Sequence, residues 1–136
     1  MATASVRYIV NDIEEAIRFY SDLLSFRVEM QPNAYFAMLS LGDLRLVLSR
    51  PGGGPGGGQV LAGGVQPAPG GWNRFQLEVP DLEATVERLR GKGARFRSEI
   101  IVGVGVKQVI VEDPSGNPVE LDEPTLAEAR LAPPET

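Results

Sequence analysis

The first fifty residues switch between a strand-like and a helical pattern of apolar positions. One set of apolar residues recurs at helical spacing and forms a single stripe: Ile13, Ala16, Ile17, Tyr20 and Leu24. Asp12 can cap this helix, and Glu15 three positions on completes a capping-box pattern. Shorter runs between turn residues predict strands at 6–10, 26–30, 35–41 and 44–48. The segment therefore predicts a βαβββ unit.

The same order of patterns returns in the second half of the chain. Asp81 caps a helix that ends at Gly91 and Gly93. Strands are expected at residues 74–79, 94–100, 104–112 and 119–121. Aligning Asp81 with Asp12, and Gly116 with Gly42, superimposes the two halves, which indicates an internal duplication.

Composition divides the chain into four segments. Residues 1–50 form the first module, 51–71 a linker, 72–123 the second module and 124–136 a tail. Glycine and proline dominate the linker, which predicts a flexible linker or long loop without regular structure. Its repeated glycines offer few side chains to a ligand, so disorder is favoured over a binding role. The tail is expected to hold a short helix and a frayed end.

Charge and residue usage narrow the classes of function. The chain has 136 residues, a net charge of −5, no cysteine and no histidine. The acidic balance argues against a nucleic-acid partner. No apolar run suits a membrane span or a signal peptide, and the absence of cysteine favours a cytoplasmic location. Without histidine, the chain lacks the usual proton shuttle and the commonest transition-metal ligand.

One stretch combines turn chemistry with a candidate functional carboxylate. The sequence Asp-Pro-Ser-Gly-Asn at 113–117 predicts a hairpin turn in which Asp113 bonds its own backbone. Glu120 follows between Val119 and Leu121, so its side chain points to the opposite face of the strand. If the two apolar residues are core, Glu120 faces either a cavity or, as an edge-strand residue, solvent.

Two motifs resemble a known family. Residues 10–26, VNDIEEAIRFYSDLLSF, look like the opening of vicinal-oxygen-chelate proteins, and residues 113–121, DPSGNPVEL, look like their closing hairpin. The superfamily includes glyoxalase I, extradiol dioxygenases, fosfomycin-resistance enzymes and bleomycin-resistance proteins. The resemblance implies an α+β fold of two tandem βαβββ modules, whose curved sheets surround a cavity. It also implies a homodimer in which the modules are exchanged between chains.

The resemblance also implies where metal ligands lie in the family's enzymes. Those positions fall on Ser5, Leu46, Arg74 and Glu120, and only Glu120 matches the usual ligand types. Leucine cannot ligate, and arginine brings a fixed positive charge to the place of a cation. The sequence therefore predicts no metal and no cofactor, which puts the usual metal-dependent activities in doubt. Arg74 and Glu120 are instead expected to form an ion pair.

Strand alternation extends this set to a candidate ligand-binding surface. Its expected members are Ser5, Arg7, Ile9, Tyr35, Phe36, Met38, Leu46, Leu48, Trp72, Arg74, Gln76 and Glu120. Trp72 is expected to form a wall of a flat apolar slot, or else to plug the linker exit. Strand 35–41 is apolar on both faces, so the facing of its residues stays open. Ordinary core or solvated roles remain the alternative for the leucines and Arg7.

Three functions remain open at this point. The favoured one is a metal-independent protein that binds and sequesters a planar or aromatic natural product, as bleomycin-resistance-type members do. The second is a metal-free lyase or isomerase with Glu120 or Glu78 as general base. An arginine beside Glu120 would lower its pKa and weaken it as a base, so no catalytic residue is assigned. The third is a structural module without a ligand.

Overall fold

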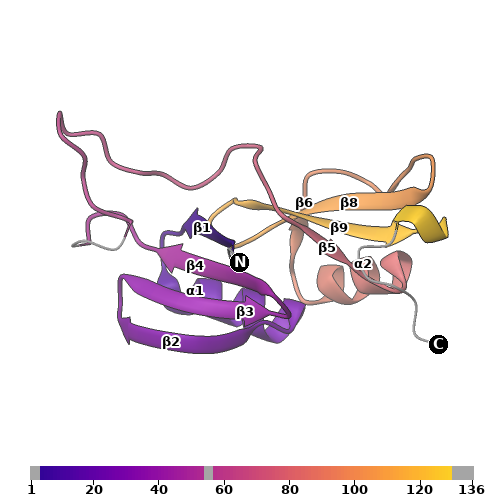
Figure 1. The fold of residues 1–136 in the computed structure, drawn as a ribbon, viewed down its shortest axis with the longest axis horizontal. Helices are drawn as coiled ribbons and strands as arrows, with labels where there is room; N and C mark the ends of the chain where they lie inside the picture. The colour runs from indigo at the N-terminus through magenta and orange to yellow at the C-terminus, as the bar shows by residue number, and fades with distance from the viewer. Residues whose placement is uncertain (1–3, 54–56, 130–136) are drawn as a thin grey trace. The chain divides into compact units, whose positions relative to one another are not determined.

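The computed structural model describes residues 4–53 and 57–129. The chain forms two compact units (Figure 1). The first contains the chain up to Gly71 together with Asp113–Asn117, and the second contains Trp72–Glu112 and the chain from Pro118. No helix among the described residues is long and apolar enough to cross a membrane.

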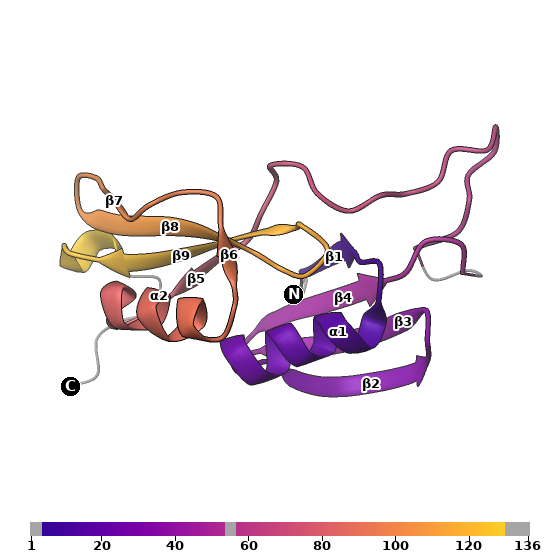
Figure 2. The same cartoon turned by 180° about the vertical axis from the view of Figure 1, so that it is seen from behind.

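The first unit is a four-stranded sheet covered on one face by a helix (Figure 2). Its elements are β1 (Ser5–Ile9), α1 (Ile13–Arg18), the π-helical turn η1 (Phe19–Leu23), β2 (Arg27–Asn33), β3 (Phe36–Leu41) and β4 (Leu44–Ser49). The strand order is β1-β4-β3-β2, with β1 parallel to β4 and the other pairs antiparallel. Asp12 caps α1 by accepting a hydrogen bond from Glu15 N at 2.9 Å, which confirms the predicted helix start.

The second unit repeats this topology. Its elements are β5 (Gln76–Glu78), α2 (Leu82–Gly91), β6 (Arg95–Phe96), β7 (Ile101–Val102), β8 (Val106–Glu112), β9 (Pro118–Pro124) and the 3-10 turn η2 (Ala127–Ala129). The strand order is β5-β9-β8-β6, and β7 also pairs with β8. Asp81 accepts from Ala84 N at 3.0 Å as the predicted cap of α2. The expected α+β fold of two βαβββ-like modules is therefore confirmed.

The strand predicted at 94–100 is split into β6 and β7. Ser98 Oγ accepts the backbone N–H of Ile110 at 3.3 Å, a donor that a continuous ladder would pair with a backbone oxygen. The strand predicted at 119–121 is longer than expected, because Asp122 and Glu123 continue the pairing opposite Gln108 and Lys107. Because Asp122 and Glu123 are polar, the pattern of apolar residues predicted only the part of the strand at 119–121.

The linker has no helix or strand in its described residues, 51–53 and 57–71, as predicted. Its backbone is nonetheless held by specific contacts. Gly52 N donates to Gly58 O at 2.8 Å, and Leu61 N donates to Val65 O at 2.7 Å. Linker residues 54–56 and the expected frayed tail at 130–136 lie outside the described residues, whereas η2 accounts for the expected short helix.

A buried carboxylate at Asp113 organises the turn between β8 and β9. Its Oδ1 accepts from the backbone N–H groups of Ser115 and Asn117, each at 2.9 Å, so the predicted turn bonding is confirmed. Its Oδ2 accepts from Tyr20 Oη at 2.8 Å and from Asn117 Nδ2 at 2.9 Å. Asn117 Nδ2 also donates to Ile9 O at 2.7 Å, and Asn117 Oδ1 accepts from Gly70 N at 2.7 Å. The turn is thereby tied to three segments of the first unit.

Tyr20 provides the helix side of this network. Its ring is fully buried and meets Phe19 and Phe26 edge to face, with centroids 5.0 and 5.5 Å away. Burial, with the charge and hydrogen bond of Asp113, raises the pKa of Tyr20 well above its ordinary value. The phenol therefore stays protonated and remains a donor to Asp113.

Removing the Asp113 carboxylate should cost more stability than removing the phenol. Asp113→Ala leaves Tyr20 and Asn117 without their acceptor, and we expect a loss of about 3 kcal/mol or more. Tyr20→Phe leaves Asn117 Nδ2 on the carboxylate, and we expect a loss of about 1–2 kcal/mol. Urea unfolding followed by circular dichroism measures both. Tyr35→Phe, at a half-exposed ring, is the control, and equal stability of all three variants would contradict this role.

Candidate functional site

One face of the second sheet is polar, and the other is core. Val119 and Leu121 of β9 are fully buried beneath the sheet, so Glu120 and Asp122 point to the opposite face. In register, Glu120 lies between Gln76 of β5 and Ile110 of β8. The next row is Glu78, Asp122 and Gln108. We call the surface formed by these two rows the carboxylate face.

Glu120 is buried, and both of its oxygens are engaged. Its side chain is only 3% exposed. Arg74 reaches Oε1 with Nε at 2.9 Å and with Nη2 at 2.8 Å, and Gln76 Nε2 donates to Oε2 at 2.7 Å. The predicted ion pair is confirmed. The alternative of a solvated edge-strand glutamate is wrong, because β9 is an inner strand between β5 and β8.

Arg74 covers the carboxylate that it binds. Its side chain is 26% exposed, against 3% for Glu120, so solvent reaches the guanidinium much more than the carboxylate. A third nitrogen, Nη1, donates to the backbone oxygen of Trp72 at 3.1 Å. The guanidinium is thus anchored at two points, which fixes its position in the unit.

Asp122 is a carboxylic acid of this face whose pKa differs from its ordinary value. Burial, followed by the hydrogen bond and negative charge of Glu120, raises the pKa of Asp122 to about 7, while Arg74 opposes the shift. Its Oδ1 is buried and has no hydrogen-bond partner among the described residues. No sequence signal marks this role, because an aspartate after Leu121 resembles an ordinary solvated residue.

Trp72 presents an aromatic surface at the edge of the carboxylate face. Trp72 is 69% exposed, and its ring centroid lies 4.6 Å from the guanidinium carbon of Arg97. Arg97 Nε also bonds Glu112 at 2.9 Å, and its backbone N–H donates to Ile110 O. Because Ile110 pairs with Glu120, these contacts place Trp72 and Arg97 near the row that contains the buried carboxylate.

The first unit places the other candidate residues on two different faces. Ser5, Arg7 and Ile9 alternate along β1 and share one face. Register pairs Arg7 with Val47 and Ile9 with Ser49, so Val47 and Ser49 lie on that face. Leu46 and Leu48 lie on the other face, are fully buried and belong to the core beneath α1. The facing predicted for these two leucines is wrong.

The error comes from the length of a turn. Two residues, Gly42 and Asp43, separate the last pair of β3 and β4, whereas five residues, 113–117, separate the last pair of β8 and β9. Gly116 and Gly42 do not hold equivalent places in turns of different length, so aligning them puts Glu120 on Leu46, one residue short of Val47. The pairing of Arg7 with Val47 matches that of Gln76 with Glu120, so Val47 holds the equivalent position.

The structure shows which face of the sheet each residue of β3 occupies, a question that the sequence left open. Phe36 pairs with Ser49 and Met38 pairs with Val47, so both share the face of Arg7, while Ala37 and Leu39 are core. Tyr35 precedes the strand and is 44% exposed, with the guanidinium of Arg50 5.2 Å from its ring centroid. The structure thus groups Phe36 and Met38 with Ser5, Arg7 and Ile9 on one face, and leaves Tyr35 just before the strand.

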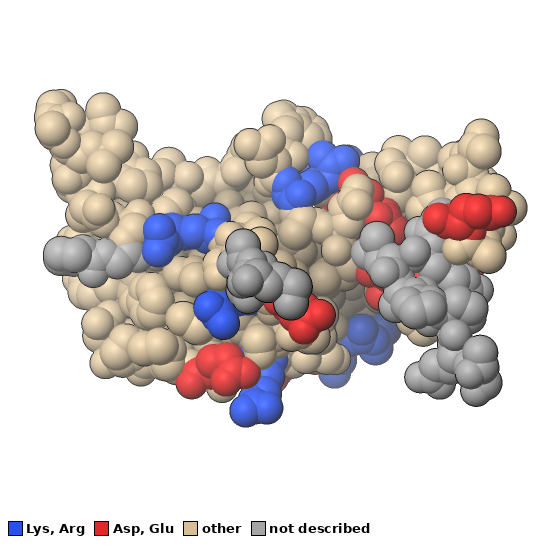
Figure 3. All heavy atoms as spheres, in the orientation of Figure 1, with Lys and Arg blue, Asp and Glu red and all other residues tan. Residues whose placement is uncertain are grey.

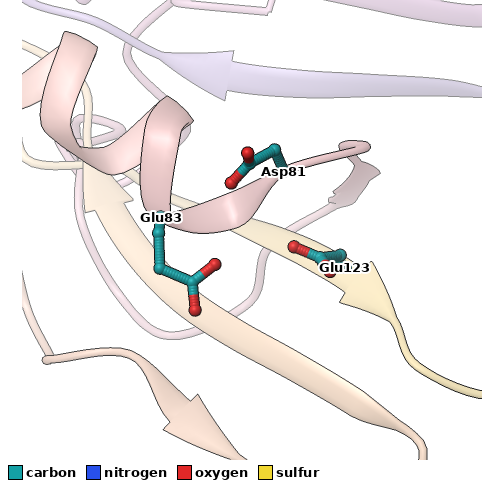
Figure 4. Close-up of side chains that lie close together, drawn as sticks. All are labelled: Asp81, Glu83 and Glu123. Carbon is teal, nitrogen blue, oxygen red and sulfur yellow. The ribbon is translucent and has the colours of Figure 1, made fainter.

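Three carboxylates also gather at the start of α2 (Figure 4). Asp81 Oδ1 caps Ala84 N, and Glu123 Oε1 accepts from Leu82 N at 2.8 Å. Glu83 accepts from Lys107 Nζ at 3.0 Å, and this hydrogen bond lowers the pKa of Glu83. Helix capping and a lysine therefore account for this cluster without an added cation.

Charge on the remaining surface is mixed. In the view of Figure 3, basic and acidic side chains are interspersed and form no single basic stripe across the visible described residues. Two open grooves of about 390 and 510 Å³ flank the end of α2 and share Arg90. Neither groove is lined by Arg74 or Glu120.

The residues at the family's metal-ligand positions do not fit a divalent ion. Ser5, Val47, Arg74 and Glu120 supply only one carboxylate. That carboxylate already accepts from a guanidinium and an amide, and a cation beside Arg74 would meet a fixed like charge. The donor set therefore disagrees with the metal enzymes, and the corrected register leaves this conclusion unchanged.

Comparison with known proteins agrees with the fold. Residues 3–121 match the sequence profile described as Glyoxalase/Bleomycin resistance protein/Dioxygenase superfamily. No curated protein matches the chain. Among solved structures, lactoylglutathione lyase from Agrobacterium tumefaciens has a TM-score of 0.68 at 20% identity, covering 90% of this chain and 92% of its own.

Two further solved structures are similar to this chain over most of its length. TnmS3, an antibiotic binding protein from Streptomyces sp. CB03234, has a TM-score of 0.69 at 22% identity, with 92% of this chain and 97% of its own covered. TioX from Micromonospora sp. ML1 has a TM-score of 0.71 at 18% identity, with 90% and 98% covered. At these identities the likeness shows a shared fold.

The raised pKa of Asp122 predicts a pH-dependent stability. The folded state holds this proton up to about pH 7, whereas the unfolded chain releases it near its ordinary value of 3.8. The contribution of Asp122 is therefore fully present below about pH 4 and is lost as the pH rises through about 7. Asp122→Asn should gain stability relative to the parent over this window.

Urea midpoints at a series of pH values measure the difference between the two proteins. Glu128→Gln, at an exposed acid of η2, is the matched charge control and should show no such trend. A constant difference between Asp122→Asn and the parent from pH 4 to pH 8 would contradict the assignment.

Proposed function

The chain belongs to the glyoxalase/bleomycin resistance protein/dioxygenase superfamily, and on this premise we propose that it is a metal-independent small-molecule binding protein. Its proposed role is to sequester a planar or aromatic natural product, in the manner of an antibiotic-resistance protein. The observation that supports this proposal is the Arg74–Glu120–Gln76 group, in which an arginine stands at a position where the resemblance implies a metal ligand.

An exposed aromatic ring supports the planar ligand. Trp72 leaves 69% of its surface open while Arg97 holds its ring from one side. A flat ligand stacked on the free part of the ring would bury apolar surface on both partners. TnmS3, which shares this fold, is described as an antibiotic binding protein, and this supports a small-molecule ligand.

The proposed surface also includes residues of the first unit. They are Ser5, Arg7, Ile9, Tyr35, Phe36 and Met38. Each module is one sheet with one helix, so a second module is needed to enclose a ligand, and the proposed assembly is a homodimer. The exposed side chains of Ile101, Val102 and Val104, at and beside β7, offer apolar surface for contacts between the two chains. Sedimentation velocity measures whether the protein is a dimer in solution. The proposed location is the cytoplasm.

A metal-free lyase or isomerase is the second candidate, and Asp122 is the observation that favours it. A pKa of about 7 suits a general base at neutral pH, and the buried Oδ1 lacks a partner among the described residues. Glu120 is a poorer base because both of its oxygens accept hydrogen bonds. Recovery of a chemically altered ligand would favour this candidate over sequestration.

Binding of a planar ligand should depend on Trp72. A thermal-shift screen of planar aromatic antibiotics should yield a compound that raises the melting temperature, because a ligand that binds only the folded state stabilises it. We expect the same compound to quench Trp72, the only tryptophan. Trp72→Ala should weaken binding roughly tenfold or more, as loss of a stacking aromatic does at other binding sites.

Leu61→Ala, at an exposed apolar side chain outside the proposed surface, is the control for loss of exposed apolar area. If Trp72→Ala binds the compound as tightly as the parent, the aromatic surface lies elsewhere. If no member of the panel shifts the melting temperature or the fluorescence, the sequestration proposal fails.

Metal removal should leave the protein unchanged. Elemental analysis of the purified protein is expected to find no stoichiometric zinc, nickel, iron or manganese, because Arg74 occupies the cation position. Dialysis against a chelator should leave the melting temperature and ligand affinity as they were. One equivalent of metal that disappears in Glu120→Ala would contradict metal independence.

A further inference from the structure

The group that a ligand meets at the centre of the carboxylate face is positive. Glu120 is 3% exposed beneath Arg74, which is 26% exposed. Coulomb interaction with an incoming group is strongest for the nearest and least covered charge. The buried carboxylate therefore acts on Arg74, by holding it, and Arg74 is the member of the pair that is placed to contact a ligand.

The guanidinium has donors to spare. A guanidinium carries five N–H groups. Among the described residues, Nε and Nη2 bond Glu120, and Nη1 bonds Trp72 O, which uses one donor on each nitrogen. One N–H remains on Nη1 and one on Nη2. Nη1 and Nη2 are neighbours in the plane of the guanidinium, so these donors suit one or two acceptor oxygens of a planar group.

The anchors make these donors rigid. A free arginine loses side-chain entropy when it orders around a ligand. Arg74 is already ordered by Glu120, which Gln76 holds in turn through Oε2 at 2.7 Å. The bond from Nη1 to Trp72 O also fixes the guanidinium beside the residue whose ring is open. A ligand stacked on that ring would bring one edge to Arg74 without reordering the site.

From this arrangement we propose that Arg74 is the specificity-determining residue of the site, and that the ligand presents a carbonyl or anionic oxygen to its two remaining N–H groups. The inference rests on the proposed function, since it concerns the polar edge of the same planar ligand. A ligand with a cationic edge is the rival, because Glu78 and Asp122 lie in the next row of the face.

Three anthracene probes of one shape separate these possibilities. They are 9-anthracenecarboxylate, 9-anthracenemethanol and protonated 9-anthracenemethylamine, and Trp72 fluorescence with calorimetry measures their affinities. We expect the carboxylate to bind roughly tenfold more tightly than the alcohol, as a charge-assisted pair of hydrogen bonds implies, and the amine to bind most weakly.

The decisive variant is Arg74→Gln combined with Glu120→Gln. Arg74→Gln alone would leave a buried carboxylate unpaired and could unfold the protein, whereas the double variant removes both charges together. It should lose the roughly tenfold preference for the carboxylate and retain affinity for the alcohol. Arg74→Lys keeps the charge but loses the planar pair of donors, so we expect it to lose most of the preference.

Lys92→Gln, at the exposed end of α2, controls for the loss of one positive charge and should keep the preference. Equal affinity for all three probes, tighter binding of the amine, or an unchanged preference in the double variant would overturn the role of Arg74 while leaving the planar-ligand site in place. Failure of all three probes to bind the parent protein would instead remove the proposed site itself, and the inference with it.

Discussion

The first unit depends on one buried carboxylate that lies far from the rest of that unit in sequence. Asp113 is fully buried and accepts four hydrogen bonds, from Tyr20, Ser115 and both the backbone and side chain of Asn117. An ionised group can remain buried at modest cost only when its oxygens are satisfied in this way. The aromatic core around Tyr20 and the turn that leads into β9 are therefore stabilised by the same group.

In the second unit, a different kind of donor satisfies the buried carboxylate. Asp113 is satisfied by neutral donors, whereas Glu120 is satisfied by a guanidinium that is itself partly open to solvent. A structural carboxylate gains nothing from an exposed partner, but a binding site does, because the partner can be shared with a second acceptor. The contrast separates a carboxylate enclosed by neutral donors from one whose charged partner reaches solvent.

The sequence predicted the features that depend on neighbouring residues. It did not predict those that depend on strand register or on contacts between residues far apart in the chain. The caps at Asp12 and Asp81 and the turn at Asp113 depend on neighbours within four residues, so a sequence pattern contains them. Leu46 was assigned to the wrong face because Gly42 and Gly116, on which the halves were aligned, do not hold equivalent places in turns of two residues at 42–43 and five at 113–117. The partnership of Tyr20 with Asp113 spans 93 residues and leaves no local trace.

The sharing of the turn at 113–117 has a consequence for how the chain is made. In a duplicated sequence, each half would ordinarily fold as it leaves the ribosome. Here the first half lacks the Asp113 carboxylate that accepts from Tyr20 until residue 113 has been synthesised, and such distant contacts also form slowly. The repeat is visible as two halves in the sequence, but a fragment that stops within the linker would lack the carboxylate that binds the buried Tyr20 phenol.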